Sequence, residues 1–303
     1  MMKLSALWKH SRPRFWHYLY GPMLILWAYI LSLYANWYLD NWFGSGWFIF
    51  WIVLFVSFLL YFTFPGNFFV YGVNDYADGD TDKFNQKKQW YEKILSNQKN
   101  ILKSIFNVQI IYWIAVFIIV LLFAFVYKSL DYYRLVLYSW IALIPFLILS
   151  WWYSVEPIRF KRRWFVDGVS NILYIISPSI LIFILDGWFS TNFLFWFLAW
   201  WLWVIAMHCF SAIPDIDADK QAWLKTTAIY LWKNNALWYC VWLYAVSWIL
   251  ASQIIGLWGS VFALVYCMMV LSAFKYDIFK IYKMFPYINF VIWFALCLII
   301  YFI

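Results

Sequence analysis

Two short acidic stretches carry the side chains best suited to chemistry in this chain. The first, from Asn74 to Asp82, contains four aspartates and directly follows an apolar run long enough to cross a bilayer. The second, from Asp215 to Asp219, contains three and follows another such run. Carboxylates at a membrane boundary are expensive to desolvate, so such clusters are typical of sites that bind cations, pass protons or line a water-filled pocket.

Helical spacing predicts which side chains of the first stretch meet. At about 100° per residue, four of them fall within roughly a 100° arc, and we call this set the first acidic motif: Asn74, Asp75, Asp78 and Asp82. Asp80 lies on the far side of such a helix.

The second acidic motif is the pair Asp215 and Asp219, which share a helix face through their i, i+4 spacing, while Asp217 points away. We expect the two motifs to converge in one pocket. Carboxylates crowded together repel unless divalent cations compensate, and all-oxygen ligands favour Mg²⁺ or Ca²⁺ over softer metals. The sequence therefore predicts a metal site formed by Asn74, Asp75, Asp78, Asp82, Asp215 and Asp219.

The composition is that of an integral membrane protein. Hydrophobic residues make up 67% of the chain and charged residues 12%, against about 45–50% and about 25% in soluble domains. The net charge of +8 would suit nucleic acid, but the basic residues are scattered between apolar runs, and membrane topology explains them better. The spans leave no room for a separate soluble domain, so we predict one membrane domain over residues 1–303.

Runs without charged residues predict nine transmembrane helices, each needing about 20 residues. The stretch 234–274 is uncharged throughout and long enough for two crossings, with the turn expected between Gln253 and Gly259. The nine runs are 15–38, 47–72, 105–127, 135–154, 168–186, 190–212, 235–254, 258–274 and 285–303.

The distribution of positive charge predicts the orientation of these helices. With the N-terminus in the cytoplasm, all but two of the 22 lysines and arginines fall on the cytoplasmic side, the exceptions being Lys128 and Arg134. The predicted fold is therefore an all-α bundle of nine helices in the cell's inner (cytoplasmic) membrane, with the N-terminus inside and the C-terminus outside. Both acidic motifs fall on the inner side, so we expect a central cavity that opens to the cytoplasm.

Basic residues accompany the acidic motifs on that side. They include the lysines that follow Asp82 and the basic loop, defined as Arg159 to Arg163. Acidic side chains bind cations, and neighbouring basic side chains bind anions. The combination is typical of a site for a polyanion that binds together with a metal ion, such as a diphosphate or a nucleotide. No Gly-rich phosphate loop or dinucleotide fingerprint is present. An allylic diphosphate fits better, because its apolar tail can lie among the helices.

These features resemble the UbiA superfamily of intramembrane prenyltransferases. The first acidic motif matches that family's first signature, N-D-x-x-D-x-x-x-D, and the second acidic motif matches its second, D-x-x-x-D. The opening from Ser11 to Trp16 is similar to the family's entry into helix 1, and the segment from Tyr153 to Arg163 resembles its tyrosine-to-basic loop between helices 4 and 5. The four matches occur in the family's order and extend over nearly the whole chain.

Within that family, the stretch from His208 to Asp219, followed by Thr226-Thr227-Ala228, is most similar to lycopene elongases, which add a five-carbon prenyl unit to the ends of a C40 carotenoid. Trp223 stands where that subgroup is expected to have glycine, and Glu156-Pro157 replaces a Pro-Pro pair. The resemblance implies transfer of an allylic group, C5 from dimethylallyl diphosphate, to lycopene or a related carotenoid dissolved in the bilayer.

The resemblance also implies roles for individual residues. Two Mg²⁺ ions held by the acidic motifs would grip the donor's diphosphate, and the catalytic residues would be Asp75, Asp78, Asp215, Asp219 and Tyr153. Substrate binding would fall to Asn74, Arg14, Tyr71, Arg159, Lys161 and Lys220. Ring faces among the 25 tryptophans and other aromatic residues would stabilise the allylic cation, but the sequence does not specify which rings.

Other functions stay open at this point. The same chemistry suits an aromatic quinone precursor, haem, a chlorophyllide or a glycerol lipid as acceptor. A cation-coupled or proton-coupled transporter would instead place its carboxylates at the bilayer midplane. His208 is interpreted as a packed or interfacial histidine rather than a base. The oligomeric state is not predicted.

Overall fold

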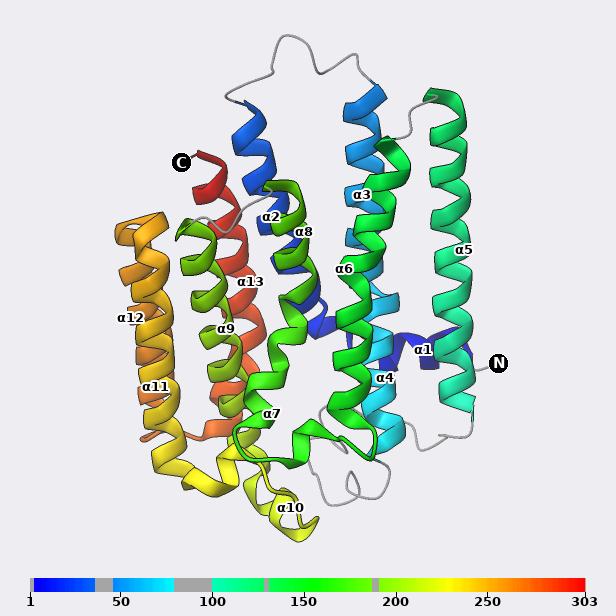
Figure 1. Ribbon diagram of the computed structural model, residues 1–303. Helices are drawn as coiled ribbons and strands as arrows, with labels where there is room; N and C mark the ends of the chain where they lie inside the picture. The colour runs from blue at the N-terminus through cyan, green and yellow to red at the C-terminus, as the bar shows by residue number, and fades with distance from the viewer. Residues whose placement is uncertain (1–2, 36–45, 79–99, 128–130, 187–190, 303) are drawn as a thin grey trace.

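Every regular element in the computed structural model is helical within the residues that it describes, which are 3–35, 46–78, 100–127, 131–186 and 191–302. The long helices lie side by side and form one bundle (Figure 1). The predicted all-α fold is confirmed for this part of the chain. Asp80 and Asp82 lie outside it, as do the lysines from Lys83 to Lys99.

The bundle combines long helices with short elements that join them. The long helices are α2 (His17–Ala35), α3 (Gly46–Thr63), α4 (Pro65–Ala77), α5 (Ile101–Tyr127), α6 (Asp131–Ser154), α8 (Ile176–Asp186), α9 (Thr191–Ala212), α11 (Thr227–Ile255), α12 (Leu257–Ser272) and α13 (Ile278–Phe302). The short elements are α1 (Leu4–His10), α7 (Val166–Val169) and α10 (Ile216–Gln221), with 3₁₀ turns η1 (Pro13–Phe15), η5 (Phe160–Arg162), η6 (Ser170–Tyr174) and η7 (Ile213–Asp215).

Hydropathy and exposure identify a multi-pass membrane protein. Five of the described helical segments are long and apolar enough to cross a bilayer, or six if the bent pair Val166–Tyr174 and Ile176–Phe183, which meets at 57°, is one span. Large apolar side chains on α5, such as Ile111 and Phe125, are exposed, as they must be on a surface that faces lipid. Two further apolar helical stretches, Trp140–Ser154 and α12 with 16 residues, are shorter.

A break before Pro65 divides the helix predicted over 47–72 into α3 and α4. Proline suits the first position of α4 because its missing N–H would have no helical partner there. The buried side-chain amide of Asn67 donates to the carbonyl oxygens of Phe62 and, at 3.0 Å, of Thr63. These bonds satisfy carbonyl groups at the end of α3. The next helix, α4, carries Asn74 and Asp75 in its last turn and has Asp78 as its C-cap.

Two glycines allow α11 and α12 to form a tight hairpin. Gly256 has φ 56°, a left-handed conformation that glycine adopts without steric cost, and it lies within the turn predicted between Gln253 and Gly259. A Cβ atom on Gly259 would lie 2.7 Å from the backbone nitrogen of Ser252. The absence of a side chain at Gly259 therefore permits the close approach of the two helices.

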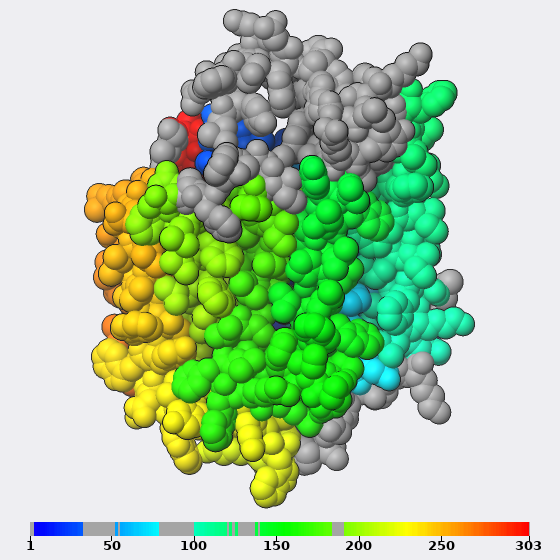
Figure 2. Space-filling view, viewed as in Figure 1, coloured from blue at the N-terminus to red at the C-terminus, as the bar shows by residue number. Residues whose placement is uncertain are grey.

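The helices that carry the acidic motifs end at the same end of the bundle. The last residues of α4, α6 and α9, the start of α7, and α10 all lie at the lower end in Figure 1. Along the bundle, α4 packs against α5 and α6, α9 against α11, and α13 against α2. In the space-filling view, the side chains of α5, α6, α9 and α11 form a continuous surface on this face (Figure 2). The fold thus brings distant segments together at one end of an apolar scaffold.

Candidate active site

A cavity of about 230 Å³ lies where α4, α9 and α10 approach the basic loop. Both acidic motifs contribute to its wall: Asn74 and Asp78 from the first, and Asp215 and Asp219 from the second. The structure thus brings together four of the residues that the spacing predicts to converge. Asp82, the last member of the first motif, lies outside the described residues.

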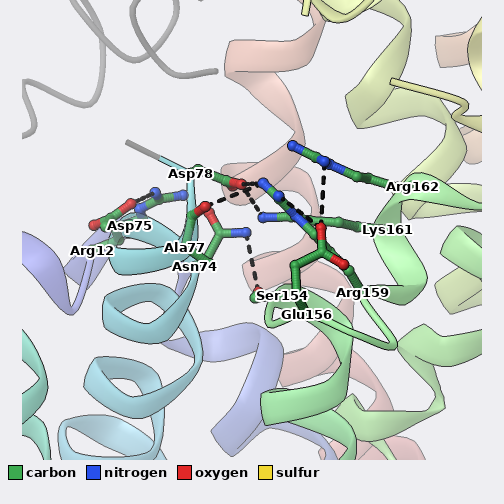
Figure 3. Close-up of polar contacts among 10 residues, drawn as sticks. All are labelled: Arg12, Asn74, Asp75, Ala77, Asp78, Ser154, Glu156, Arg159, Lys161 and Arg162. Atoms are coloured by element: carbon green, nitrogen blue, oxygen red, sulfur yellow. Dashed lines mark hydrogen bonds and ion pairs between the residues drawn. The ribbon is translucent and has the colours of Figure 1, made fainter. Parts of the chain in front are cut away.

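Asp75 is turned away from this cavity and is not among its lining residues. Its Oδ1 accepts a hydrogen bond from Arg12 Nη2 at 2.5 Å, and its Oδ2 lies 2.9 Å from His10 Nδ1. The residue is only 2% exposed, so these two partners replace water around the carboxylate. Figure 3 shows Asp75 directed toward Arg12. The prediction that Asp75 points into the same pocket as Asn74 and Asp78 is therefore not met. Asp75 follows Asn74 directly, and side chains of neighbouring helical residues point about 100° apart around the helix axis.

Asp78 faces the basic loop. It is the C-cap residue of α4, with φ −101° and ψ 9°. Helical periodicity therefore predicts side-chain directions only as far as Ala77. The Oδ1 of Asp78 accepts hydrogen bonds from Arg159 Nη2 at 3.0 Å and from Lys161 Nζ. Arg159 also donates to the carbonyl oxygen of Ala77 at 3.1 Å, at the negative end of the helix. These contacts tie the basic loop to the first acidic motif (Figure 3).

Local backbone geometry directs the basic side chains. Arg159 has φ 39° and begins the η5 turn, after which Lys161 is buried at the cavity wall while Arg162 is partly exposed. Glu156 accepts hydrogen bonds from Arg159 at 3.2 Å and from Arg162 at 3.4 Å. On the other side, the side-chain amide of Asn74 donates to the hydroxyl of Ser154 at 3.5 Å. These contacts anchor the segment that leads into the basic loop.

The second acidic motif lies where α9 gives way to shorter turns. Asp215 closes η7 and Asp219 lies in α10; both are partly exposed and line the cavity, whereas Asp217 is exposed and outside it. This is the arrangement that the i, i+4 spacing predicts. The turn after α10 passes through Trp223 at φ 56°, which explains why the resembled subgroup is expected to have glycine at this position.

The oxygen donors that the two acidic motifs place at the cavity wall match Mg²⁺ in kind, since they are one side-chain amide and three carboxylates. Within the described ranges, no three His, Cys, Asp or Glu side chains are grouped closely enough to hold a metal by themselves. Magnesium in proteins is commonly held by one or two carboxylates together with water and substrate phosphates. The donor set therefore suits a metal that binds together with a phosphate ligand.

The remaining predicted substrate-binding residues, and the predicted catalytic residue Tyr153, divide into two groups. Tyr71, Tyr153 and Lys161 line the cavity. Arg14 and Lys220 do not: the Arg14 guanidinium lies 5.8 Å from the ring centroid of Phe15, and Lys220 Nζ lies 3.6 Å from that of Trp232. Spacing alone could not distinguish these two groups, because it does not show in which direction a long side chain extends.

The aromatic part of the cavity wall consists of five tyrosines and one phenylalanine: Phe15, Tyr18, Tyr71, Tyr153, Tyr174 and Tyr282. None of the tryptophans in the described ranges lines the cavity. The guanidinium of Arg12, another lining residue, lies 4.7 Å from the centroid of the Tyr71 ring. The cavity wall thus combines charged and polar side chains with phenol rings.

Sequence reasoning did not identify Arg12 and assigned His208 a packing role, yet both side chains line the cavity. For His208, the spacing of the sequence could have indicated a place in the site. This histidine precedes Asp215 by seven residues, and Ser211 lies between them at helical spacing, so the three share one face of α9 and its extension. Arg12 carried no comparable signal, because its contact with Asp75 joins two distant parts of the chain.

Comparison with known proteins adds independent information. A model of the UbiA prenyltransferase family matches residues 41–287. A lycopene elongase/hydratase from Haloarcula japonica is 34% identical over 294 residues, which cover 95% of this chain and 88% of the relative. A lycopene elongase/hydratase from Haloferax volcanii is 32% identical over 248 residues, which cover 80% of this chain and 69% of the relative.

Solved structures of similar fold come from Archaeoglobus fulgidus. A UbiA homolog bound to DMAPP and Mg²⁺ superposes with a TM-score of 0.57 at 15% identity, covering 98% of this chain and 99% of the other. The homolog bound to GPP and Mg²⁺ gives a TM-score of 0.53 over 96% of this chain and 99% of the other. At this identity the likeness shows that the fold is shared.

Proposed function

The chain belongs to the UbiA prenyltransferase family, and we propose that it moves an allylic C5 group from dimethylallyl diphosphate onto an apolar acceptor dissolved in the membrane. The observation that carries the proposal is the single cavity lined by both acidic motifs, a lysine and an arginine, with phenol rings around the remainder. Such a cavity can hold a metal-bound diphosphate at one end and a hydrocarbon chain at the other. The solved UbiA homolog bound to DMAPP and Mg²⁺ supports this donor.

Metal binding is assigned to the oxygen donors of the two motifs. We propose two Mg²⁺ ions, held by Asn74, Asp78, Asp82, Asp215 and Asp219 together with diphosphate oxygens. Bound there, the ions act as Lewis acids that stabilise the charge of the departing diphosphate. Asp75 has another role, because its carboxylate engages Arg12: it orients a guanidinium at the cavity wall.

Positive side chains complete the diphosphate site. Lys161 and Arg12 line the cavity and neutralise diphosphate oxygens, while Arg159 holds Asp78 against the basic loop. When the C–O bond of the donor breaks, its electron pair leaves with the diphosphate and an allylic cation remains. The rings of Tyr71 and Tyr153 face that cation, and each ring face contributes about 0.5–2 kcal/mol of stabilisation.

Lycopene is the proposed acceptor, a choice supported by the reaction named for both archaeal relatives. The electron pair of a terminal C=C bond of the carotenoid attacks the allylic cation and forms the new C–C bond. A tertiary cation results, which loses a proton or takes up water. The apolar helices around the cavity let such an acceptor arrive from the bilayer.

The proposal includes one membrane domain over residues 1–303, with nine spans in the inner membrane and the cavity facing the cytoplasm. The family match covers 41–287, and the described residues of both acidic motifs lie with the basic loop at one end of the bundle (Figure 1). The concentration of lysines and arginines on that side of the predicted topology supports a cytoplasmic location for it.

Expression beside a lycopene-producing pathway, followed by mass spectrometry of the pigments, tests the acceptor. We expect carotenoids of 45 and 50 carbons, and alkylation of an aromatic compound without them would contradict lycopene as acceptor. In parallel, the purified protein is incubated with dimethylallyl diphosphate with and without Mg²⁺. Metal-dependent release of diphosphate is expected. Its absence in the presence of every tested acceptor would contradict prenyl transfer and leave the transporter to be tested.

A further inference from the structure

His208 lines the cavity from α9, about two helical turns before the second acidic motif. It lies in α9, seven residues before Asp215 and on the same helix face. At about 1.5 Å per residue this separation amounts to roughly 10 Å along the helix. A donor whose diphosphate is held at the second acidic motif has room to extend its carbon chain along α9 toward the imidazole. His208 is therefore a candidate for contact with the carbons of the product cation.

A buried carboxylate stands behind this imidazole. Oδ2 of Asp167 lies 3.6 Å from Nε2 of His208, and Asp167 is 1% exposed. Asp167 is held in place by hydrogen bonds from the backbone N–H of Thr227 at 2.8 Å, from that of Gly168 at 2.9 Å, and from the Thr227 hydroxyl. The carboxylate is fixed where it can stabilise a positive charge that forms on the imidazole ring.

The orientation of the ring leaves one nitrogen for the cavity. Nε2 of His208 is buried and directed toward Asp167, so Nδ1 is the nitrogen available to a ligand. The Tyr153 ring packs edge-on against the imidazole with centroids 6.0 Å apart. Among the described lining residues His208 is the only imidazole, and the three carboxylates in the wall belong to the acidic motifs. No other described lining residue outside the acidic motifs is as good a proton acceptor.

We propose that His208 is a catalytic base that accepts the proton released after prenyl transfer, and that Asp167 is its positioning residue. The inference rests on the proposed function. In the step concerned, a C–H bond next to the tertiary cation breaks, its electron pair forms a C=C bond, and the proton moves to Nδ1 of His208. If water adds instead, a lone pair on its oxygen forms the C–O bond and the water proton moves to the same nitrogen.

The test compares two products of one reaction mixture. Purified enzyme, dimethylallyl diphosphate, lycopene and Mg²⁺ are incubated, and released diphosphate and elongated carotenoid are measured together. His208→Gln retains a polar side chain but cannot accept the proton. We expect carotenoid formed per diphosphate released to fall by about 100-fold or more, since general-base catalysis contributes about 10²–10⁴-fold. The prenyl alcohol produced when water captures the allylic cation should account for the difference.

His17→Gln is the matched control, because His17 is a buried helical histidine that does not line the cavity. It should retain the wild-type ratio. A wild-type ratio in His208→Gln would overturn the inference and identify another acceptor, such as the leaving diphosphate. A wild-type enzyme that releases no diphosphate would instead overturn the proposed function, and the inference with it.

A second variant covers the case in which His208→Gln does not fold. His208→Ala opens a space into which imidazole can diffuse, and added imidazole should restore the carotenoid-to-diphosphate ratio in a dose-dependent manner. Folded His208→Ala whose ratio already equals that of the wild type, or does not respond to imidazole, would contradict the inference. Asp167→Asn should lower the ratio less than His208→Gln does, because it keeps the base and removes only its charged partner.

Discussion

At the level of single residues, Asp75 and Asp219 show that two members of similar motifs can have opposite surroundings. Asp75 is buried against Arg12 and His10, whereas Asp219 is partly exposed at the cavity wall. Removing one partner of a buried ion pair leaves an uncompensated charge and costs about 3–5 kcal/mol. Removing a partly exposed carboxylate costs less stability, because water can solvate the groups that it leaves behind.

We therefore expect Asp75→Ala and Asp219→Ala both to abolish prenyl transfer, but only Asp75→Ala to lower the thermal unfolding temperature substantially. Product formation and thermal unfolding in detergent are measured on the same preparations. Asp217→Ala is the matched control, because Asp217 is exposed and outside the cavity; it should retain both properties. Equal unfolding temperatures for Asp75→Ala and Asp219→Ala would contradict the structural role assigned to Asp75.

Spacing along the sequence predicted the cavity residues that belong to one helix face and missed contacts between distant segments. Asn74 and Asp78, like Asp215 and Asp219, could be grouped from periodicity alone. The partner of Asp75 could not, because Arg12 reaches it from the turn between α1 and η1 through a contact that no local pattern encodes. The phenol-lined wall was unpredictable for the same reason: it is assembled from α2, α4, α6, η6 and α13.

At the level of elements, the turn between α10 and α11 holds a tryptophan in a conformation that favours glycine. Trp223 has φ 56° and is 91% exposed, so its ring contributes little packing, while the left-handed backbone costs about 1–2 kcal/mol for a residue with a Cβ atom. Trp223→Gly should raise the thermal unfolding temperature by a few degrees. Trp223→Ala also removes the ring but keeps the Cβ atom, so it should give no gain; an equal gain would show that the ring, not the backbone, is responsible.

The α11–α12 hairpin gives a prediction of opposite sign. A Cβ atom at Gly259 would meet the backbone of Ser252, which cannot move aside, whereas one at Gly72 would meet the flexible end of Ile105 at 2.8 Å. Overpacking of this kind costs about 1–3 kcal/mol. Gly259→Ala should therefore lower the unfolding temperature clearly, and Gly72→Ala should do so less. Similar losses in the two variants would contradict the close approach described for the hairpin.

Helix interruptions were predicted unevenly. The break at Gly256 could be inferred because residues 234–274 are too long for one crossing. The division before Pro65 was missed, since the apolar run 47–72 reads as continuous even though a proline lies inside it. The bend between η6 and α8 is not visible in the hydropathy either, because the polar residues Ser170 and Asn171 interrupt the apolar run only mildly. The side-chain amide of Asn171 donates to the carbonyl oxygen of Asp167, a local bond that the sequence does not reveal.

At the level of the whole molecule, the proposed orientation can be tested at the two ends of the bundle. Gln221, at the end of α10, and Leu257, at the start of α12, are exposed at opposite ends (Figure 1). In a background with the four native cysteines replaced by alanine, Leu257→Cys should react with a membrane-impermeant maleimide in intact cells. Gln221→Cys should react only after permeabilisation. The reverse labelling pattern would overturn the orientation inferred from the positive charges.

The N-terminal segment has a consequence for how this protein is produced. Arg12 pairs with Asp75 and His10 contacts it, while Phe15 and Tyr18 form part of the cavity wall, yet all four precede residue 41, where the family match begins. A fragment trimmed to the recognisable family region would lose these groups together with α2 and much of α13. Affinity tags are accordingly safer behind Phe302, far from α10, than directly before Leu4.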